Sequence, residues 1–191
     1  MENNRWQRVL VIASLILSGE AIFTLPYHVT RFFRPTFLEV FDLSATELGV
    51  AQSAYGFAAM VAYFFGGPLA DRFEPRKPLA GSLWATALGG LYLATFPSVA
   101  GVTLVWGFFG LTNILFFYAA LIKATRSWGG DTQQGLAYGL LDGGRGLLAA
   151  VLASVGVFAF SIAFPLGYDA ASLPQKAEVL RQVIYGYTAV T

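Results

Sequence analysis

Repeated apolar runs dominate the sequence, and each is about as long as a helix that crosses a bilayer. They lie at about residues 9–33, 46–65, 78–96, 99–122 and 135–164, and a sixth begins near Val183 and continues to Thr191. A lipid core needs roughly 20 apolar residues of helix. The pattern therefore predicts an all-α, polytopic membrane helix bundle with five transmembrane helices plus the start of a sixth. The first run is too long for a signal peptide core, so we interpret it as a permanent span.

The composition excludes several classes of function. Hydrophobic residues make up 56% of the 191 residues and charged residues 12%, about half the usual charged share. With no cysteine and one histidine, the chain is not expected to bind a metal or a cofactor. A net charge of +1 provides no basic patch for nucleic acid. We also do not expect an enzyme, because no carboxylates, histidines or nucleophiles pair at one depth.

The segment between the fifth and sixth runs is polar. Asp169, Lys176, Glu178 and Arg181 fall between residues 167 and 182, with apolar residues at helical spacing among them. This pattern predicts a short amphipathic helix at the membrane interface, separate from the sixth span.

Basic residues indicate the orientation of the chain. Cytoplasmic loops of membrane proteins carry an excess of lysine and arginine. A cytoplasmic N-terminus places seven basic residues inside and four outside: Arg5, Arg8, Arg72, Arg76, Lys77, Lys123 and Arg126 against Arg31, Arg34, Lys176 and Arg181. We therefore predict a cytoplasmic N-terminus.

The loop after the second run carries a motif with its own physical logic. Gly67 would let another helix approach closely, and Asp71 is placed to pair with a cation or a helix N-terminus. Arg72, Arg76 and Lys77 would hold the turn at the positive side of the membrane. The alternative is an ordinary positively charged cytoplasmic loop.

The same loop resembles the signature of the major facilitator superfamily, in which glycine, three residues and aspartate precede basic residues. Gly67, Asp71, Arg72, Arg76 and Lys77 match this signature, whereas glutamate stands at position 74, where glycine is usual. The resemblance implies that these five residues latch the cytoplasmic helix ends in the outward-open state. Their role would be gating and not solute contact.

From Leu48 to Lys77 the chain is most similar to the organophosphate:phosphate antiporter branch of that superfamily. It lacks the branch's lysine in the second span, and Arg31 lies near the outer end of the first span, where the branch has an arginine deeper. Members have twelve spans in two halves. The resemblance therefore implies a bacterial inner-membrane protein whose C-terminal half lies beyond this chain.

Three charged residues fall inside predicted spans, where an unpaired charge is costly. Glu20 lies in the first span, and Asp142 and Arg145 lie in the fifth. At 1.5 Å per residue, Glu20 lies about 16 Å and Arg145 about 15 Å along their helices. We predict that their charged groups lie within about 4 Å of each other or share a watery cavity. Either they bind a solute or coupling ion, or they neutralise each other and fix the packing. Asp142 is spaced to pair with Arg145.

Weaker candidates lie nearby. Arg31 and Arg34 lie near the end of the first span. Either their side chains extend to the lipid headgroups, or they form an entry site for an anionic solute. Tyr27 and His28 are interpreted as interfacial. Asn113 could contact a solute, although a hydrogen bond between helices is the favoured interpretation.

The fifth run has glycines at positions 135, 139 and 143, a spacing that predicts close approach of a neighbouring helix, with a hinge as the alternative.

Together these features predict a secondary transporter that moves a small polar or anionic solute across the bilayer by alternating access. Coupling would be to protons or to a counter-solute. The alternative is a membrane sensor for a small anionic metabolite built on the same fold, because the antiporter branch includes such a receptor.

Overall fold

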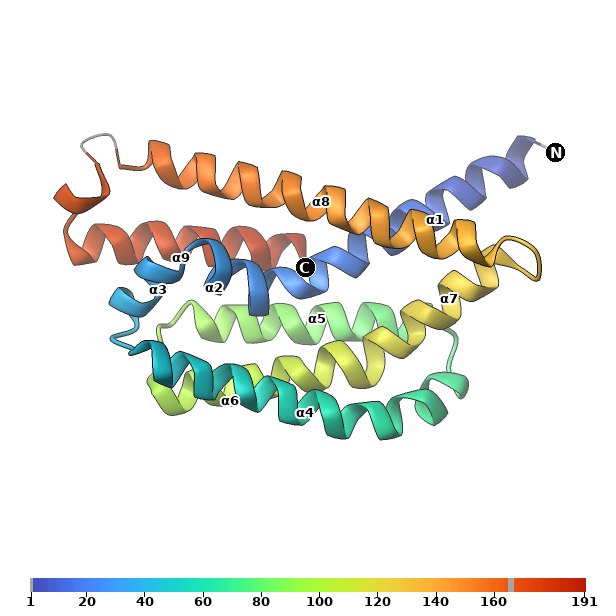
Figure 1. Cartoon of the computed structure of the whole chain (residues 1–191), viewed down its shortest axis with the longest axis horizontal. Helices are drawn as coiled ribbons and strands as arrows, with labels where there is room; N and C mark the ends of the chain where they lie inside the picture. The colour runs from blue at the N-terminus through green and yellow to red at the C-terminus, as the bar shows by residue number, and fades with distance from the viewer. Residues whose placement is uncertain (1, 165–166) are drawn as a thin grey trace.

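The computed structural model describes residues 2–164 and 167–191 and forms an elongated bundle of roughly parallel and antiparallel helices (Figure 1). In chain order the elements are α1 (Glu2–Phe23), η1 (Thr24–His28), α2 (Val29–Phe32), α3 (Arg34–Val40), α4 (Ala45–Asp71), α5 (Arg76–Leu93), α6 (Val99–Leu111), η2 (Thr112–Tyr118), α7 (Ala119–Gly129), α8 (Gln134–Ile162), η3 (Tyr168–Ala170) and α9 (Leu173–Val190). The segments η1 and η2 are wide π-helical turns within otherwise α-helical spans, and η3 is a short 3₁₀ turn.

Four helices are long and apolar enough to cross a membrane by length and composition: Arg5–Phe32, Ala45–Leu69, Val99–Gly129 and Gln134–Ile162. Helices α5 and α9, of 18 residues each, lie alongside them in the bundle. The predicted all-helical membrane bundle is therefore confirmed. The count of five spans plus the start of a sixth remains a prediction.

The polar segment before the sixth run does not form a separate interfacial helix, so that prediction is wrong. Helix α9 begins at Leu173, ten residues before Val183, and Ser172 and Gln175 form a capping box at its start. Its charged groups have partners in the bundle. Lys176 donates to Glu39 at 2.9 Å, and this hydrogen bond lowers the pKa of the Glu39 carboxyl. Paired in this way, the charges do not interrupt the helix.

The two ends of the bundle carry different loops (Figure 1). The N-terminus, the α4–α5 connection and the α7–α8 connection lie at one end, and α3, the α5–α6 connection and the start of α9 lie at the other. Contacts agree with this arrangement, because Lys123 Nζ reaches the carbonyl of Asp71 and Lys176 reaches Glu39. The predicted separation of the basic residues Arg72, Lys77 and Arg126 from Lys176 is confirmed. The cytoplasmic assignment of the first end remains a prediction.

Among the described residues, the most extensive helix pairing joins α4 and α6. Gly110 makes it possible, since a Cβ atom built there would lie 2.5 Å from the carbonyl oxygen of Tyr55 and 3.0 Å from Ala58 Cβ. Large apolar side chains, including Trp106 and Phe109, are fully buried beside this crossing. On α6, glycine thus lets the backbone of α4 approach closely, and the large apolar side chains fill the space beside the crossing.

The predicted glycine contact face of α8 is wrong. Gly135, Gly139 and Gly143 are exposed, and no atom of the described chain lies within 4 Å of a Cβ built on them. The packed face instead carries Leu141, which is buried, and Gly144, whose added Cβ would lie 2.6 Å from Ile16 Cδ1. Four-residue spacing identifies a helical face but does not determine which neighbour that face meets.

Candidate solute-binding site

Glu20 and Arg145 meet near the middle of their helices, as the depth argument predicted. Glu20 Oε2 lies 3.6 Å from Arg145 Nε, and the Glu20 side chain is 9% exposed. Gly19 creates the space, because a Cβ there would lie 3.0 Å from Arg145 Cδ. The guanidinium therefore crosses the surface of α1 where that helix has no side chain.

Asp142 completes the charge arrangement around Arg145. Its Oδ1 lies 3.8 Å from Arg145 Nη1, which confirms the predicted pair on one face of α8. The Asp142 side chain is 72% exposed, however, so this ion pair contributes little to stability. On its other side the guanidinium lies over the ring of Phe23, with 5.2 Å between Arg145 Cζ and the ring centroid. Arg145 is thus held mainly by α1.

His28 belongs to the same cluster, so its interfacial assignment is wrong. Its Nε2 lies 3.0 Å from Glu20 Oε1, and the residue is buried. The π-helical turn η1 rotates the end of the span so that the imidazole points back along the helix towards Glu20. The eight-residue spacing is only a weak signal for this contact, because a regular α-helix would leave His28 and Glu20 about 80° apart around its axis.

The cluster forms part of a pocket of about 620 Å³ between the first span and α8. Arg31 and Tyr27 line its walls together with Glu20, His28 and Arg145. Within the described residues, His28 Nδ1 and Arg145 Nε are buried without a hydrogen-bond partner. The pocket therefore offers two guanidinium groups and unused hydrogen-bonding capacity, an arrangement suited to a small anion.

Asn113 lies outside this pocket. It is fully buried in η2, and its Nδ2 donates to the carbonyl of Ile22 at 3.2 Å. Pro26 has no N–H to bond that carbonyl four residues earlier, so Asn113 supplies a donor from another helix. Thr86 and Thr112 donate to Asn113 Oδ1, both at 3.2 Å. The favoured interhelical hydrogen bond is confirmed.

Replacing Asn113 by alanine is expected to destabilise the protein by about 1–2 kcal/mol, because the Ile22 carbonyl and two threonine hydroxyls lose a buried partner. Thermal unfolding of the full-length protein in detergent measures the loss. Gln52→Ala is the matched control, since Gln52 bonds Thr30 at 3.4 Å in a partly exposed position. Equal melting temperatures for the two variants would contradict a structural role for Asn113.

The predicted gating loop joins α4 to α5 at one end of the bundle. Gly67 is exposed, and no described atom approaches a Cβ built on it, so its predicted close contact is wrong. The neighbouring Gly66 makes the close approach instead, because a Cβ built on it would lie 3.1 Å from the carbonyl oxygen of Leu115. The loop is tethered by Lys123, which donates to the carbonyls of Asp71 and Phe73 at 3.3 and 3.2 Å.

The remaining basic residues of the loop, Arg72, Arg76 and Lys77, are exposed, and Arg76 pairs with Glu74 at 3.3 Å. This exposed pair occupies the turn where the family usually has glycine, and an ion pair of this kind adds little stability. The latch function of the five signature residues remains a prediction.

Comparison with known proteins agrees with these features. A family model matches residues 9–168, most of the chain. The chain belongs to the Major Facilitator Superfamily. Members of this superfamily are membrane transporters, which is consistent with the expectation that the chain is not an enzyme. The similarity to the organophosphate:phosphate antiporter branch remains a prediction.

Two curated relatives of this superfamily member are named inner membrane proteins. It is 29% identical over 190 residues to inner membrane protein YqcE of Escherichia coli, a match covering 100% of this chain and 42% of the relative. It is 34% identical over 158 residues to inner membrane protein YihN of the same organism, covering 82% and 37%. An uncharacterized MG294 homolog of Mycoplasma pneumoniae is 24% identical over 195 residues, covering 95% and 41%.

The chain thus spans about two fifths of the length of the curated relatives it matches. No solved structure gives a significant match. The apolar helices and the inner-membrane relatives together establish an integral inner-membrane protein.

Proposed function

We propose that the full-length protein is a secondary transporter that moves a small anionic solute by alternating access, coupled to protons. Superfamily membership supports the transporter class. The anion preference and the coupling rest on the cluster of Glu20, His28 and Arg145 beside Arg31. A C-terminal half, expected from the length of the relatives, would complete the pathway.

The observation that carries the proposal is the 3.6 Å pair between Arg145 and Glu20 in a pocket with unused donors. Charges at this depth are kept for function or neutralised by a partner. Here the neutralisation is incomplete, because the separation exceeds that of a hydrogen bond and Arg145 Nε has no hydrogen-bond partner within the described chain.

The arrangement suggests how proton and solute binding are coupled. With Glu20 ionised, its carboxylate offsets the charge of Arg145 and weakens attraction for an incoming anion. A proton shared by Glu20 and His28, which lie 3.0 Å apart, removes that offset. Arg31 and Arg145 then face the pocket as cations, with Arg145 offset only by the exposed Asp142. Anion binding is favoured in the protonated state, which is the thermodynamic requirement for proton and anion symport.

Glu20→Gln is the decisive test of this coupling. Proteoliposomes containing the full-length protein and the pH dye pyranine would receive inorganic phosphate, organic phosphates and sugar acids in turn. For the wild type, we expect one of these anions to drive protons inward, more strongly as the external pH falls. The introduced glutamine amide cannot take up a proton and removes the carboxylate whose charge the proton neutralises, so the variant should transport that anion with a flatter pH profile and reduced proton entry.

Two other outcomes of these measurements would contradict the proposal. An unchanged pH profile for Glu20→Gln would exclude Glu20 as the coupling group. An anion that raises the melting temperature of the protein without accumulating in the vesicles would favour the sensor. Glu47→Gln is the matched control, because Glu47 lies at the exposed start of α4, where it caps the helix with Ser44, far from the pocket.

A further inference from the structure

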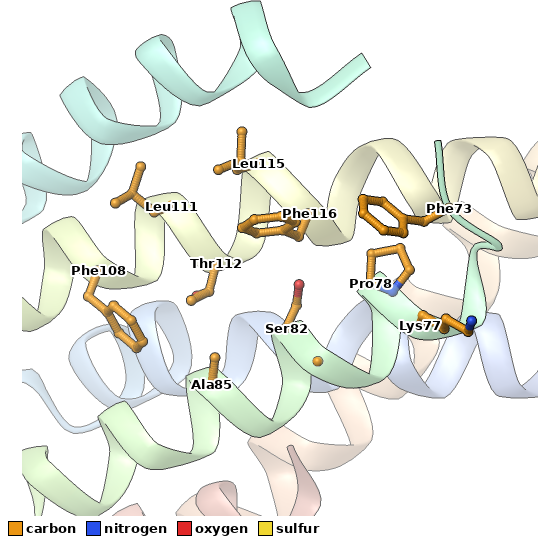
Figure 2. A pocket seen from close by; sticks show the side chains of 11 residues that line it. Phe73, Lys77, Pro78, Ser82, Ala85, Phe108, Leu111, Thr112, Leu115 and Phe116 are labelled. Atoms are coloured by element: carbon orange, nitrogen blue, oxygen red, sulfur yellow. The ribbon is translucent and has the colours of Figure 1, made fainter. Parts of the chain in front are cut away.

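A second pocket lies between α5 and the α6–η2 span, separate from the solute-binding cluster (Figure 2). Its volume is about 560 Å³, within the range of small-ligand pockets. Its walls are almost entirely apolar: Phe108, Leu111 and Phe116 come from the α6–η2 span, and Ala85 comes from α5. Such a groove suits a hydrocarbon chain and not a solute transported through water.

One end of the groove carries a positive charge. Lys77 lies in the first turn of α5, beside Phe73 and Pro78, at the end of the bundle where α4 connects to α5 (Figure 2). Arg76 is engaged by Glu74, which leaves Lys77 as the charged residue lining the groove. The N-terminus of α5 is the positive end of its helix dipole, and it adds to the positive electrostatic potential at this end of the groove.

Ser82 provides an independent sign of a ligand. This serine is 3% exposed, and its Oγ has no hydrogen-bond partner among the residues that the structure describes. Figure 2 shows the hydroxyl directed from α5 across the groove. A buried hydroxyl without a partner is unfavourable, so an acceptor in the groove would stabilise it. Thr112, the other hydroxyl that lines the groove, makes its hydrogen bonds to Thr86 and Asn113 and not to Ser82.

We propose that this groove binds an anionic phospholipid from the bilayer. The phosphate would pair with Lys77, and an ester carbonyl would accept from Ser82, five residues or about 7.5 Å further along α5. One acyl chain would lie along Ala85 towards Phe108. This order of phosphate, ester and hydrocarbon follows the polarity gradient from the bilayer surface inward. A free phosphate would leave the apolar walls uncovered, so the occupant is a lipid.

Photocrosslinking tests the site. The full-length protein in nanodiscs would receive phosphatidylglycerol carrying a diazirine in one acyl chain, or phosphatidylcholine with the same chain, and labelled peptides would be mapped by mass spectrometry. We expect phosphatidylglycerol to label α5 and η2 and to be displaced by unlabelled phosphatidylglycerol. Lys77→Gln should reduce the preference for phosphatidylglycerol about fivefold, the effect of one basic residue at a membrane surface. Arg126→Gln removes an exposed charge at the same end but outside the groove and should not change it.

A second pair of variants tests the hydrocarbon part. Ala85→Phe fills the groove and should abolish labelling there, whereas Ala80→Phe, at an exposed position of α5 that does not line the groove, should not. Melting temperatures confirm that each variant is folded. Equal labelling by both lipids, labelling that survives Ala85→Phe, or no labelling because another part of the full-length protein covers the groove would each overturn the proposal.

Discussion

Replacing Arg145 by alanine is expected to abolish anion uptake, with a loss of about 100-fold or more, because the solute loses a charge-assisted contact at the centre of the pocket. The same change should destabilise the protein. It leaves Glu20, whose side chain is 9% exposed, without its cationic partner, and breaking a buried pair typically costs about 3–5 kcal/mol. The substitution therefore lowers both stability and transport, and the loss of uptake must be distinguished from an effect of unfolding.

The double variant Arg145→Ala with Glu20→Gln makes that separation. Removing both charges leaves no uncompensated buried ion, since Asp142 is exposed, so the melting temperature should recover most of the way, whereas uptake should stay abolished. Arg34→Ala is the matched control, because Arg34 is exposed after the first span and does not line the pocket. Recovery of uptake together with stability would show that the pair only fixes the packing.

Replacing Gly110 by alanine should produce a large packing defect from a single added methyl group. The new Cβ would lie 2.5 Å from the carbonyl oxygen of Tyr55. A backbone atom of a packed helix cannot move aside as a flexible side chain can, so α4 and α6 must separate. We expect a loss of about 3 kcal/mol, at the upper end of the range for overpacked cores.

Gly107→Ala provides the comparison one turn earlier on the same helix. There the added Cβ would lie 4.0 Å from Ala54 Cβ, an ordinary contact. Thermal unfolding of the full-length protein should show a marked drop for Gly110→Ala and little change for Gly107→Ala. Similar melting temperatures for the two variants would mean that the α4–α6 crossing is looser than the structure indicates.

Much of the fold could be predicted because hydrocarbon thickness fixes helix length. The runs at 46–65, 99–122 and 135–164 correspond to α4, to the span from α6 to α7, and to α8, with starts that agree within one residue and ends that differ by two to seven residues. The predicted start of the sixth helix near Val183 is too late, because the polar stretch before it has the composition of an interfacial segment. Lys176 and Arg181 are accommodated by Glu39 and by the carbonyl of Ala94, partners that are distant in sequence.

The site was predicted in part for a similar reason. Depth along a span follows from residue number, so the meeting of Glu20 and Arg145 could be anticipated. The direction in which a side chain points around the helix axis is harder to derive from residue number. The π-helical turn at η1 directs His28 inward, and the phase of α8 selects Gly144 over Gly143 for packing against Ile16. Neither depends on local sequence alone.

Helix α9 has a consequence for how the protein is made. It is not among the helices apolar enough to cross a membrane on composition, and its cations meet Glu39 in α3 and the end of α5. The hydroxyl of Thr191 also donates to the carbonyl of Ala21 at 3.1 Å. Placing such a helix in lipid alone is unfavourable. During biosynthesis, α9 would therefore enter the membrane only after α1, α3 and α5 have folded and can contact it. Its insertion then depends on tertiary contacts with these helices as well as on partitioning from water into lipid.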